Sequence, residues 1–202
     1  MPSAVEEMEA LRRRALSCAD CELSRTRRHV VFGEGDPEAD VVLVGEGPGE
    51  WEDRTGRPFV GRAGKLLDAV LREAGLKREE LYITNIVKCR AATEVGGRLR
   101  NRPPRASEVK ACRKWLEAQL GIIRPKVLVC IGGPAASLLL HKGFKMTEER
   151  GRWFIDTPYA PSAMAVLHPA YVLRKEGDDF LRARELLIED LMKVRRRLTE
   201  GL

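Results

Sequence analysis

One stretch decides the fold of this chain: residues 40–61, with the sequence DVVLVGEGPGEWEDRTGRPFVG. Residues 40–44 are mostly apolar and β-branched, which predicts a buried strand. Residues 63–74, just beyond the stretch, carry apolar side chains at helical spacing and predict a helix. The glycines between strand and helix let the backbone approach a ligand closely, at the strand end where open α/β sheets bind their ligands. The stretch therefore predicts a ligand site in an α/β fold.

Two phosphate-binding motifs are also rich in glycine, and both are excluded here. A Walker loop needs Ser or Thr directly after its Gly-Lys pair, whereas Leu66 follows Gly64 and Lys65. The dinucleotide fingerprint needs a third glycine three positions after its second, and Glu50 occupies that position. The site is therefore not predicted to be a nucleotide-phosphate site of either kind.

The rest of the chain continues the alternation of strands and helices. Further strands are predicted at residues 81–84, 127–131 and 163–167. Further helices are predicted at residues 107–122, with Ser107 as N-cap, and at residues 134–140 and 178–198. This order predicts the α/β class: a three-layer α/β/α fold with a mostly parallel central sheet of about four strands. The length suits a single domain over residues 1–202.

Polar and glycine residues follow directly after these predicted strands. They are the glycines of residues 45–49, Asn85, Gly132, Gly133 and His168. Because the carboxyl ends of parallel strands meet at one edge of a sheet, one crevice is expected to gather them.

Four of the cysteines have a spacing that indicates a metal site. Cys18 and Cys21 form a CxxC pair at the end of a predicted N-terminal helix, and Cys89 and Cys112 lie far downstream. A reducing cytosol disfavours disulfides, so this set suggests four thiolate ligands. The spacing alone does not separate zinc from iron–sulfur, because both accept four cysteines. Cys130 lies in a buried strand pattern and is expected to fill the core.

The motifs taken together resemble the family 4 uracil-DNA glycosylases, the iron–sulfur branch of their superfamily. The likeness extends from Cys18 to about residue 191, in motifs that keep the family's order: GEGPG and TGRPFVG in the first stretch, then NIVKCR at residues 85–90 and HPAY at residues 168–171. The resemblance implies a uracil-DNA glycosylase of base-excision repair, acting on DNA that contains uracil and releasing free uracil. It also implies one [4Fe–4S] cluster on Cys18, Cys21, Cys89 and Cys112. No redox partner motif is evident, so a structural role is expected, with a redox role as the alternative.

Excision of uracil means hydrolysis of an N-glycosidic bond to a base that has left the stack. The protein must hold the extruded base, stabilise charge on its O2, and stabilise an oxocarbenium-like sugar beside a water. Phe59 is the candidate stacking wall. Asn85 is expected to donate to uracil O4 and to accept from N3–H, a pattern that cytosine reverses. His168 is placed to donate to O2, for which a neutral imidazole is sufficient; His29 and His141 are expected to be structural or at the surface.

The catalytic carboxylate lies in the glycine-rich stretch. Glu46 is the candidate for positioning the water or stabilising the sugar cation, with Glu50, Glu52 and Asp53 as rivals. Gly45 and Gly47 are expected to face the base with their backbone. No lysine of the matched motifs is an obvious Schiff-base nucleophile, so a monofunctional glycosylase is predicted.

Residues 93–105 are basic and rich in glycine and proline, which predicts a loop. Arg98, Arg100, Asn101 and Arg102 are expected to contact DNA phosphates. The loop is longer than is usual in family 4 and resembles that of related proteins that trap uracil DNA covalently through a histidine. Asn101 falls near that histidine's position, so turnover is predicted rather than trapping. A uracil-DNA binding protein with little turnover stays the alternative, as does a metal protein that binds DNA without chemistry.

The residues after His168 resemble the family's loop that follows the base out of the helix. Leu173 or Val172 is the candidate wedge, with Arg174 and Lys175 on phosphates. The net charge of +6 suits a polyanionic partner. No run approaches the ~20 apolar residues of a membrane span, and no export signal is visible, so a cytoplasmic monomer is expected.

Overall fold

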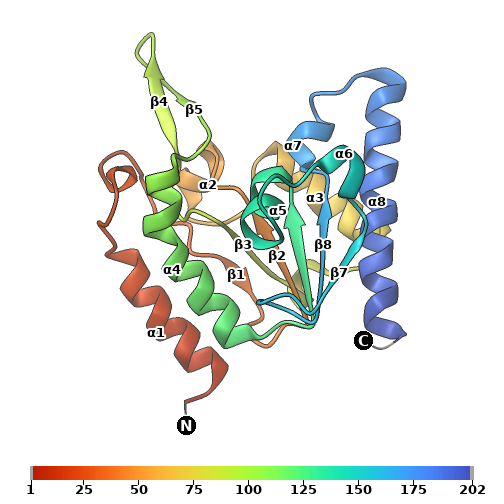
Figure 1. Cartoon of the computed structure of the whole chain (residues 1–202). Coiled ribbons are helices and arrows are strands. Elements are labelled where there is room, and N and C mark those ends of the chain that lie inside the picture. Colours follow the sequence, from red (N-terminus) through yellow and green to blue (C-terminus); the bar gives the residue numbers. More distant parts are fainter. Residues whose placement is uncertain (1, 201–202) are drawn as a thin grey trace.

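The computed structural model describes residues 2–200 and is built around a six-stranded sheet in the order β1-β3-β2-β6-β8-β7 (Figure 1). The four central strands are parallel: β3 (Tyr82–Asn85), β2 (Val41–Gly45), β6 (Val127–Ile131) and β8 (Ser162–Val166). The edge strands β1 (Glu34–Gly35) and β7 (Trp153–Ile155) run antiparallel to their neighbours. The α/β class and the mostly parallel sheet are therefore confirmed. The strand count rises to six because both edge strands are too short to leave a periodic pattern.

Alternate residues of the central strands face two separate helical layers. Val42 and Val44 pack with α1 (Ala4–Leu16), α4 (Ala106–Ile123) and α5 (Gly133–Leu139). Val41 and Leu43 pack with α3 (Arg62–Glu73), α7 (Pro169–Val172) and α8 (Gly177–Thr199). Figure 1 shows α1 and α4 on one side of the sheet and α3 and α8 on the other. Side chains covered on both faces explain why these strands are continuously apolar.

Cys130 fills the core as expected. It lies in β6, is fully buried and belongs to the cluster beneath α1 and α4.

Helix α4 begins earlier than predicted. Its N-cap is Arg105, and Ser107, the predicted N-cap, lies inside the helix. The reason is Glu108, whose carboxylate accepts the backbone N–H of Arg105 and so caps the helix from position N3.

The segment predicted as a loop is a β-hairpin. β4 (Ala92–Val95) pairs antiparallel with β5 (Arg98–Asn101), and the hairpin projects from the body of the molecule (Figure 1). Gly96 and Gly97, with φ of 59° and 73°, supply the two positive values that a two-residue turn of this kind requires. The loop prediction was wrong for residues 93–101, because strands that are exposed along almost their whole length show no alternation of apolar and polar residues.

The remaining elements are short. They are η1 (Glu22–Arg25), α2 (Glu50–Thr55), η2 (Arg78–Glu80) and α6 (Met146–Glu149). Of these, α2 follows β2 directly and contributes to the site described next. None of the helices in residues 2–200 combines the length and apolarity needed to cross a membrane.

Candidate functional site

A cleft of about 360 Å³ lies beyond the carboxyl ends of β2, β3 and β8. Glu46, Gly47, Phe59, Asn85 and His168 line it together. The crevice expected from the strand ends is therefore present, as parallel sheets commonly provide. Gly132 and Gly133 do not line this cleft; a Cβ on Gly132 would lie 3.1 Å from the His168 Cβ, so this glycine packs behind the histidine.

Phe59 and Asn85 are packed so closely that Gly45 is required between them. A Cβ added to Gly45 would lie 2.5 Å from both the Phe59 Cζ and the Asn85 Oδ1. Gly45 does not itself line the cleft. Its contribution is space for the two side chains, whereas Gly47 and Gly49 have backbone in the cleft wall.

Phe59 is held in a backbone conformation that a bulky residue rarely adopts, with φ at 51°. Its side chain is buried, and its ring centroid lies 5.9 Å from that of His168. Gly64 packs against the turn so tightly that a Cβ there would lie 1.9 Å from the Phe59 carbonyl oxygen. The ring is thus a fixed wall of the cleft.

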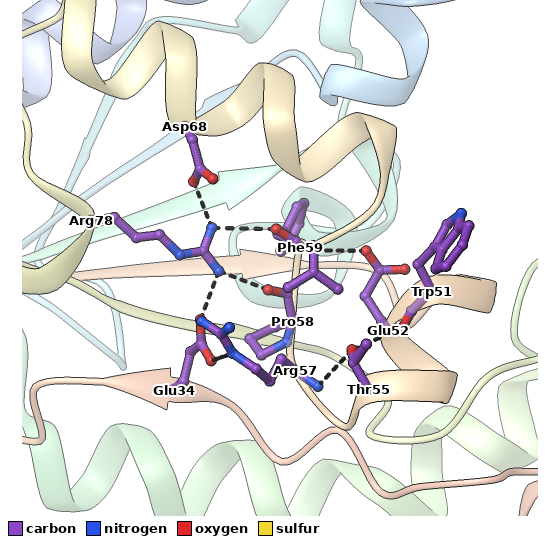
Figure 2. A network of polar contacts seen from close by, with 10 residues as sticks. Glu34, Trp51, Glu52, Thr55, Arg57, Pro58, Phe59, Asp68 and Arg78 are labelled. Carbon is purple, nitrogen blue, oxygen red and sulfur yellow. Dashed lines mark hydrogen bonds and ion pairs between the residues drawn. The ribbon is translucent and has the colours of Figure 1, made fainter.

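The turn around Phe59 is secured from two sides (Figure 2). Arg78 donates to the carbonyl oxygen of Pro58 at 2.7 Å and to that of Phe59 at 3.4 Å, while Glu34 and Asp68 hold its guanidinium. On the other side, one carboxylate oxygen of Glu52 accepts the N–H of Val60 at 2.9 Å and of Gly61 at 2.8 Å. Neither role was predicted, because no sequence motif marks Arg78 or Glu52 as a residue that holds a turn.

Asn85 ends β3 with a side chain that is 2 % exposed. Its Oδ1 is buried and has no hydrogen-bond partner among residues 2–200. A buried acceptor without a donor is costly, at about 1–3 kcal/mol, and such atoms are rare in folded proteins. Because Asn85 lines the cleft, this acceptor is the feature of β3 that suits a ligand with an N–H group.

Lys88 lies beneath Asn85 and was not predicted. Its side chain is 1 % exposed, and Nζ donates to the Asn85 carbonyl at 2.8 Å, to Thr84 Oγ1 and to Gln119 Oε1. Burial lowers the pKa of this ammonium to about 7. The network fixes the end of β3. The available sequence signal was a lysine directly after the apolar pair Ile86 and Val87.

His168 is held as a neutral imidazole. It is the N-cap of α7, and its Nδ1 accepts the backbone N–H of Ala170 at 3.0 Å. Burial lowers the pKa of His168 to about 4, with the charge of Arg174 acting in the same direction. With Nδ1 as acceptor, the proton is on Nε2, which is free to donate to a ligand.

The structure separates the four candidate carboxylates. Glu52 holds the Phe59 turn and the Gly49 N–H, and the Asp53 carboxylate accepts the N–H of Arg28 at 2.8 Å. Glu50 is ion-paired with Arg54. Glu46 lines the cleft and makes no side-chain hydrogen bond or ion pair with another of residues 2–200, and burial raises its pKa. Glu46 is thus the carboxylate left available to a ligand.

The hairpin brings Asn101 into the cleft wall. Arg90 donates to the Asn101 Oδ1 at 2.7 Å and to the Leu99 carbonyl, so it holds the hairpin in place. Side chains alternate along a strand, so Arg98 and Arg100 lie on the face of β5 opposite to Asn101, where both arginines are exposed. Arg102 also lines the cleft, but Glu108 pairs with its guanidinium at 2.6 Å.

The residues after His168 divide into buried and exposed. Val172 is fully buried in the core, so the alternative that it acts as a wedge is wrong. Leu173 is half-buried and Arg174 is exposed, both just beyond α7. The other two histidines have structural contacts: His29 Nδ1 pairs with the Asp53 carbonyl at 2.8 Å and His141 Nε2 with Glu149 at 2.7 Å.

Cys18, Cys21, Cys89 and Cys112 line one small cavity, as their spacing led us to expect. Three N–H groups point at their sulfurs: the Lys88 backbone lies 3.2 Å from Cys112 Sγ, Trp115 Nε1 3.4 Å from Cys18 Sγ, and Arg27 Nη1 3.5 Å from Cys89 Sγ. Such bonds stabilise thiolates bound to metal. The residues thus fit a group held by four thiolates.

No three side chains of residues 2–200 converge closely enough to hold a single metal ion. A zinc ion would need its thiolates at about 2.3 Å from one centre.

The chain is similar to known proteins over nearly its whole length. The family model described as the uracil DNA glycosylase superfamily matches residues 32–192. The type-4 uracil-DNA glycosylase of Thermotoga maritima is 42 % identical over 94 % of this chain and 94 % of its own. That of Archaeoglobus fulgidus is 38 % identical over 90 % of this chain and 94 % of its own. The type-5 enzyme of Thermus thermophilus is 34 % identical over 82 % and 79 %.

Proposed function

This chain belongs to the type-4 uracil-DNA glycosylases of the uracil DNA glycosylase superfamily, and on that basis we propose that it excises uracil from DNA in base-excision repair. The observation that carries the proposal is Asn85, which lines the cleft and whose buried Oδ1 has no donor among residues 2–200. Uracil presents N3–H to such an acceptor, whereas cytosine presents a bare nitrogen there. The amide's N–H then meets uracil O4.

We propose that Phe59 and His168 complete the recognition of the base. The Phe59 ring stacks on the extruded pyrimidine, and the His168 Nε2–H donates to O2, where negative charge develops as the glycosidic bond breaks. A neutral imidazole gives this hydrogen bond without adding a proton to the reaction. The arrangement fits hydrolysis with a uracil anion as leaving group.

Glu46 is our candidate for the other half of the reaction. Its carboxylate lines the same cleft and is not engaged by another described side chain. An anion there stabilises the oxocarbenium-like sugar and orients the attacking water. The attacking water loses its proton to solvent, the departing uracil anion takes up a proton from solvent, and the products are free uracil and an abasic strand.

We propose a [4Fe–4S] cluster on the thiolates of Cys18, Cys21, Cys89 and Cys112. When bound, the cluster supplies a covalent cross-link between α1, the segment after β3 and α4. We propose that residues 1–202 form a single domain, with the N-terminal helix tied on by the cluster, and that the protein acts as a cytoplasmic monomer.

We propose turnover rather than covalent trapping. A trap needs a nucleophile beside the anomeric carbon, and at Asn101 the cleft has a neutral amide whose Oδ1 is already held by Arg90. Free uracil is therefore released and the protein recycles. The hairpin's outer arginines, Arg98 and Arg100, together with Leu173 and Arg174 near α7, contact the DNA around the cleft.

One experiment tests both that the protein excises uracil and that it turns over rather than traps the DNA. A fluorescently labelled oligonucleotide with one uracil, single-stranded or in a duplex, is incubated with limiting protein, treated with alkali and run on a denaturing gel. We expect strand cleavage at the uracil over many turnovers and no cleavage at thymine or cytosine. A labelled band shifted by the mass of the protein would instead show trapping, and no cleavage at all would contradict the proposal.

A further inference from the structure

Trp51 presents a large aromatic surface at the rim of the cleft. It lies in α2, lines the cleft, and is 57 % exposed, whereas Trp115 is 7 % exposed. The Trp51 indole lies outside the hydrophobic core, so core packing does not account for its exposure. Exposed tryptophan of this kind is typical of surfaces that bind a partner.

The indole is held in a defined orientation. The guanidinium of Arg54 lies over the ring, 5.3 Å from its centroid, and Glu50 in turn holds Arg54. A Cβ on Gly61 would lie 3.5 Å from Trp51 Cδ1, so the ring's edge rests on the Gly61 backbone. Figure 2 shows the indole beyond Glu52, away from the network around Arg78. A ring fixed in this way loses little entropy when it binds.

The surroundings suit a nucleotide of the strand that contains uracil. Arg62 lines the same rim, is exposed, and its side chain forms no hydrogen bond or ion pair with residues 2–200. Asn85 and His168 lie in the same cleft, so a neighbouring nucleotide of the strand reaches the rim. Flat aromatic faces accept any base, at about 1–3 kcal/mol per stacked base.

We propose that Trp51 is a stacking subsite for an unpaired nucleobase next to the extruded uracil, with Arg62 on the intervening phosphate. The inference rests on the proposed function and adds a second base position to it. In duplex DNA the neighbours of uracil are already paired and stacked, whereas in a single strand their faces are free. Trp51 therefore contributes mainly to the binding of single-stranded uracil DNA.

A cycle that changes both protein and DNA tests the subsite. Excision and binding are measured for wild type, Trp51→Ala and Trp51→Phe on single-stranded oligonucleotides with a base or a base-free residue on each side of the uracil. Binding is measured by anisotropy with 2′-fluorodeoxyuridine oligonucleotides, which resist cleavage. We expect Trp51→Ala to raise KM and Kd roughly tenfold with kcat little changed, and Trp51→Phe to restore most of the loss.

The decisive result is whether the effect of removing a flanking base depends on the presence of Trp51. For one flanking position, removal of the base should weaken wild type about tenfold and leave Trp51→Ala nearly unchanged. Ile155→Ala is the control, because Ile155 is 53 % exposed at the opposite end of the sheet. Equal losses in wild type and Trp51→Ala at both flanks would overturn the subsite. Absence of uracil release by wild type would contradict the proposed function instead, and the anisotropy cycle would still decide the subsite.

Discussion

Three side chains in the cleft are suited to different tasks by their surroundings. Among the described residues 2–200, Asn85 keeps an acceptor without a partner, His168 is fixed as a donor through Nε2, and Glu46 keeps a carboxylate available. The same short stretch contains Glu52 and Asp53, whose carboxylates are used within the protein. At the scale of the residue, function follows from which polar atoms the fold leaves free.

Asn85→Ala and His168→Ala should each slow single-turnover excision by about 10²–10³, because each removes one preorganised hydrogen bond to the leaving base. Binding of uracil DNA should change much less, since phosphate contacts dominate affinity. The measurement is rapid-quench excision with protein in excess, beside anisotropy binding. Excision at the wild-type rate by either variant would remove that residue from the proposed site.

The acid limb of the pH–rate profile should belong to Glu46. Burial raises the pKa of this carboxyl above its ordinary value, so its anion is lost as pH falls through that raised pKa. The pKa of His168, lowered to about 4, keeps the imidazole neutral over the same range. Single-turnover rates should therefore decline on acidification at a pH above the carboxyl's usual range of about 4.3.

Glu46→Gln is the matching control for that profile. It should be slow at every pH and should lack the acid limb, because an amide does not titrate. An acid limb that persists unchanged in Glu46→Gln would assign the ionisation to another group.

At the scale of the element, the short turn between α2 and α3 is held by long-range contacts. Phe59 has a backbone φ of 51°, and Arg78, from the segment before β3, fixes its carbonyl side. Glu52 fixes the N–H side of the residues that follow. The strain of the turn is offset by these bonds, and the ring is placed opposite His168 as a result.

Arg78→Ala should loosen the turn and lower kcat/KM for uracil excision about tenfold or more, with a loss of stability of about 1.5–3 kcal/mol from bonds to a charged group. Arg57→Ala is a matched control, because Arg57 also pairs with Glu34 but is mostly exposed and does not contact the Phe59 carbonyl. Its change in stability should be under about 1 kcal/mol. Equal effects of the two variants would show that the Glu34 ion pair, and not the turn, is responsible.

At the scale of the molecule, the cysteine cavity and the cleft are adjacent parts of one structure. Lys88 joins them: its backbone N–H points at Cys112, while its Nζ supports the carbonyl of Asn85. The cavity also gathers α1, α4 and the segment after β3, which are far apart in sequence. Loss of the proposed cluster is therefore expected to affect the fold as a whole.

Anaerobically purified protein should be brown, with about four iron and four sulfide per chain. Cys89→Ala should lose iron and become unstable or insoluble, because ligation contributes to folding free energy. Cys130→Ala, a change in the core away from the cavity, should keep its full iron content. Stoichiometric zinc without iron in the wild type would contradict the cluster.

The sequence alone determined the order of the four parallel strands and the main helices between them, the presence of Glu46, Phe59, Asn85 and His168 in one cleft, and the grouping of the four cysteines. Those features are encoded locally, in apolar runs of strand length and in residues placed just after strands, and the motifs of the family add their identity. The continuous apolar runs predicted β2, β6 and β8 because each is covered on both faces.

Only the tertiary structure decided which carboxylate is free, which residues hold the Phe59 turn and what the basic segment forms. Glu46 and Glu52 are chemically identical and lie six positions apart in the same glycine-rich stretch, yet only the folded chain places backbone N–H groups against Glu52. The tertiary structure also decided three further features: the hairpin at residues 92–101, the burial of Lys88 and the exposure of Trp51. Burial and pairing are properties of contacts between distant segments, and a local pattern does not contain them.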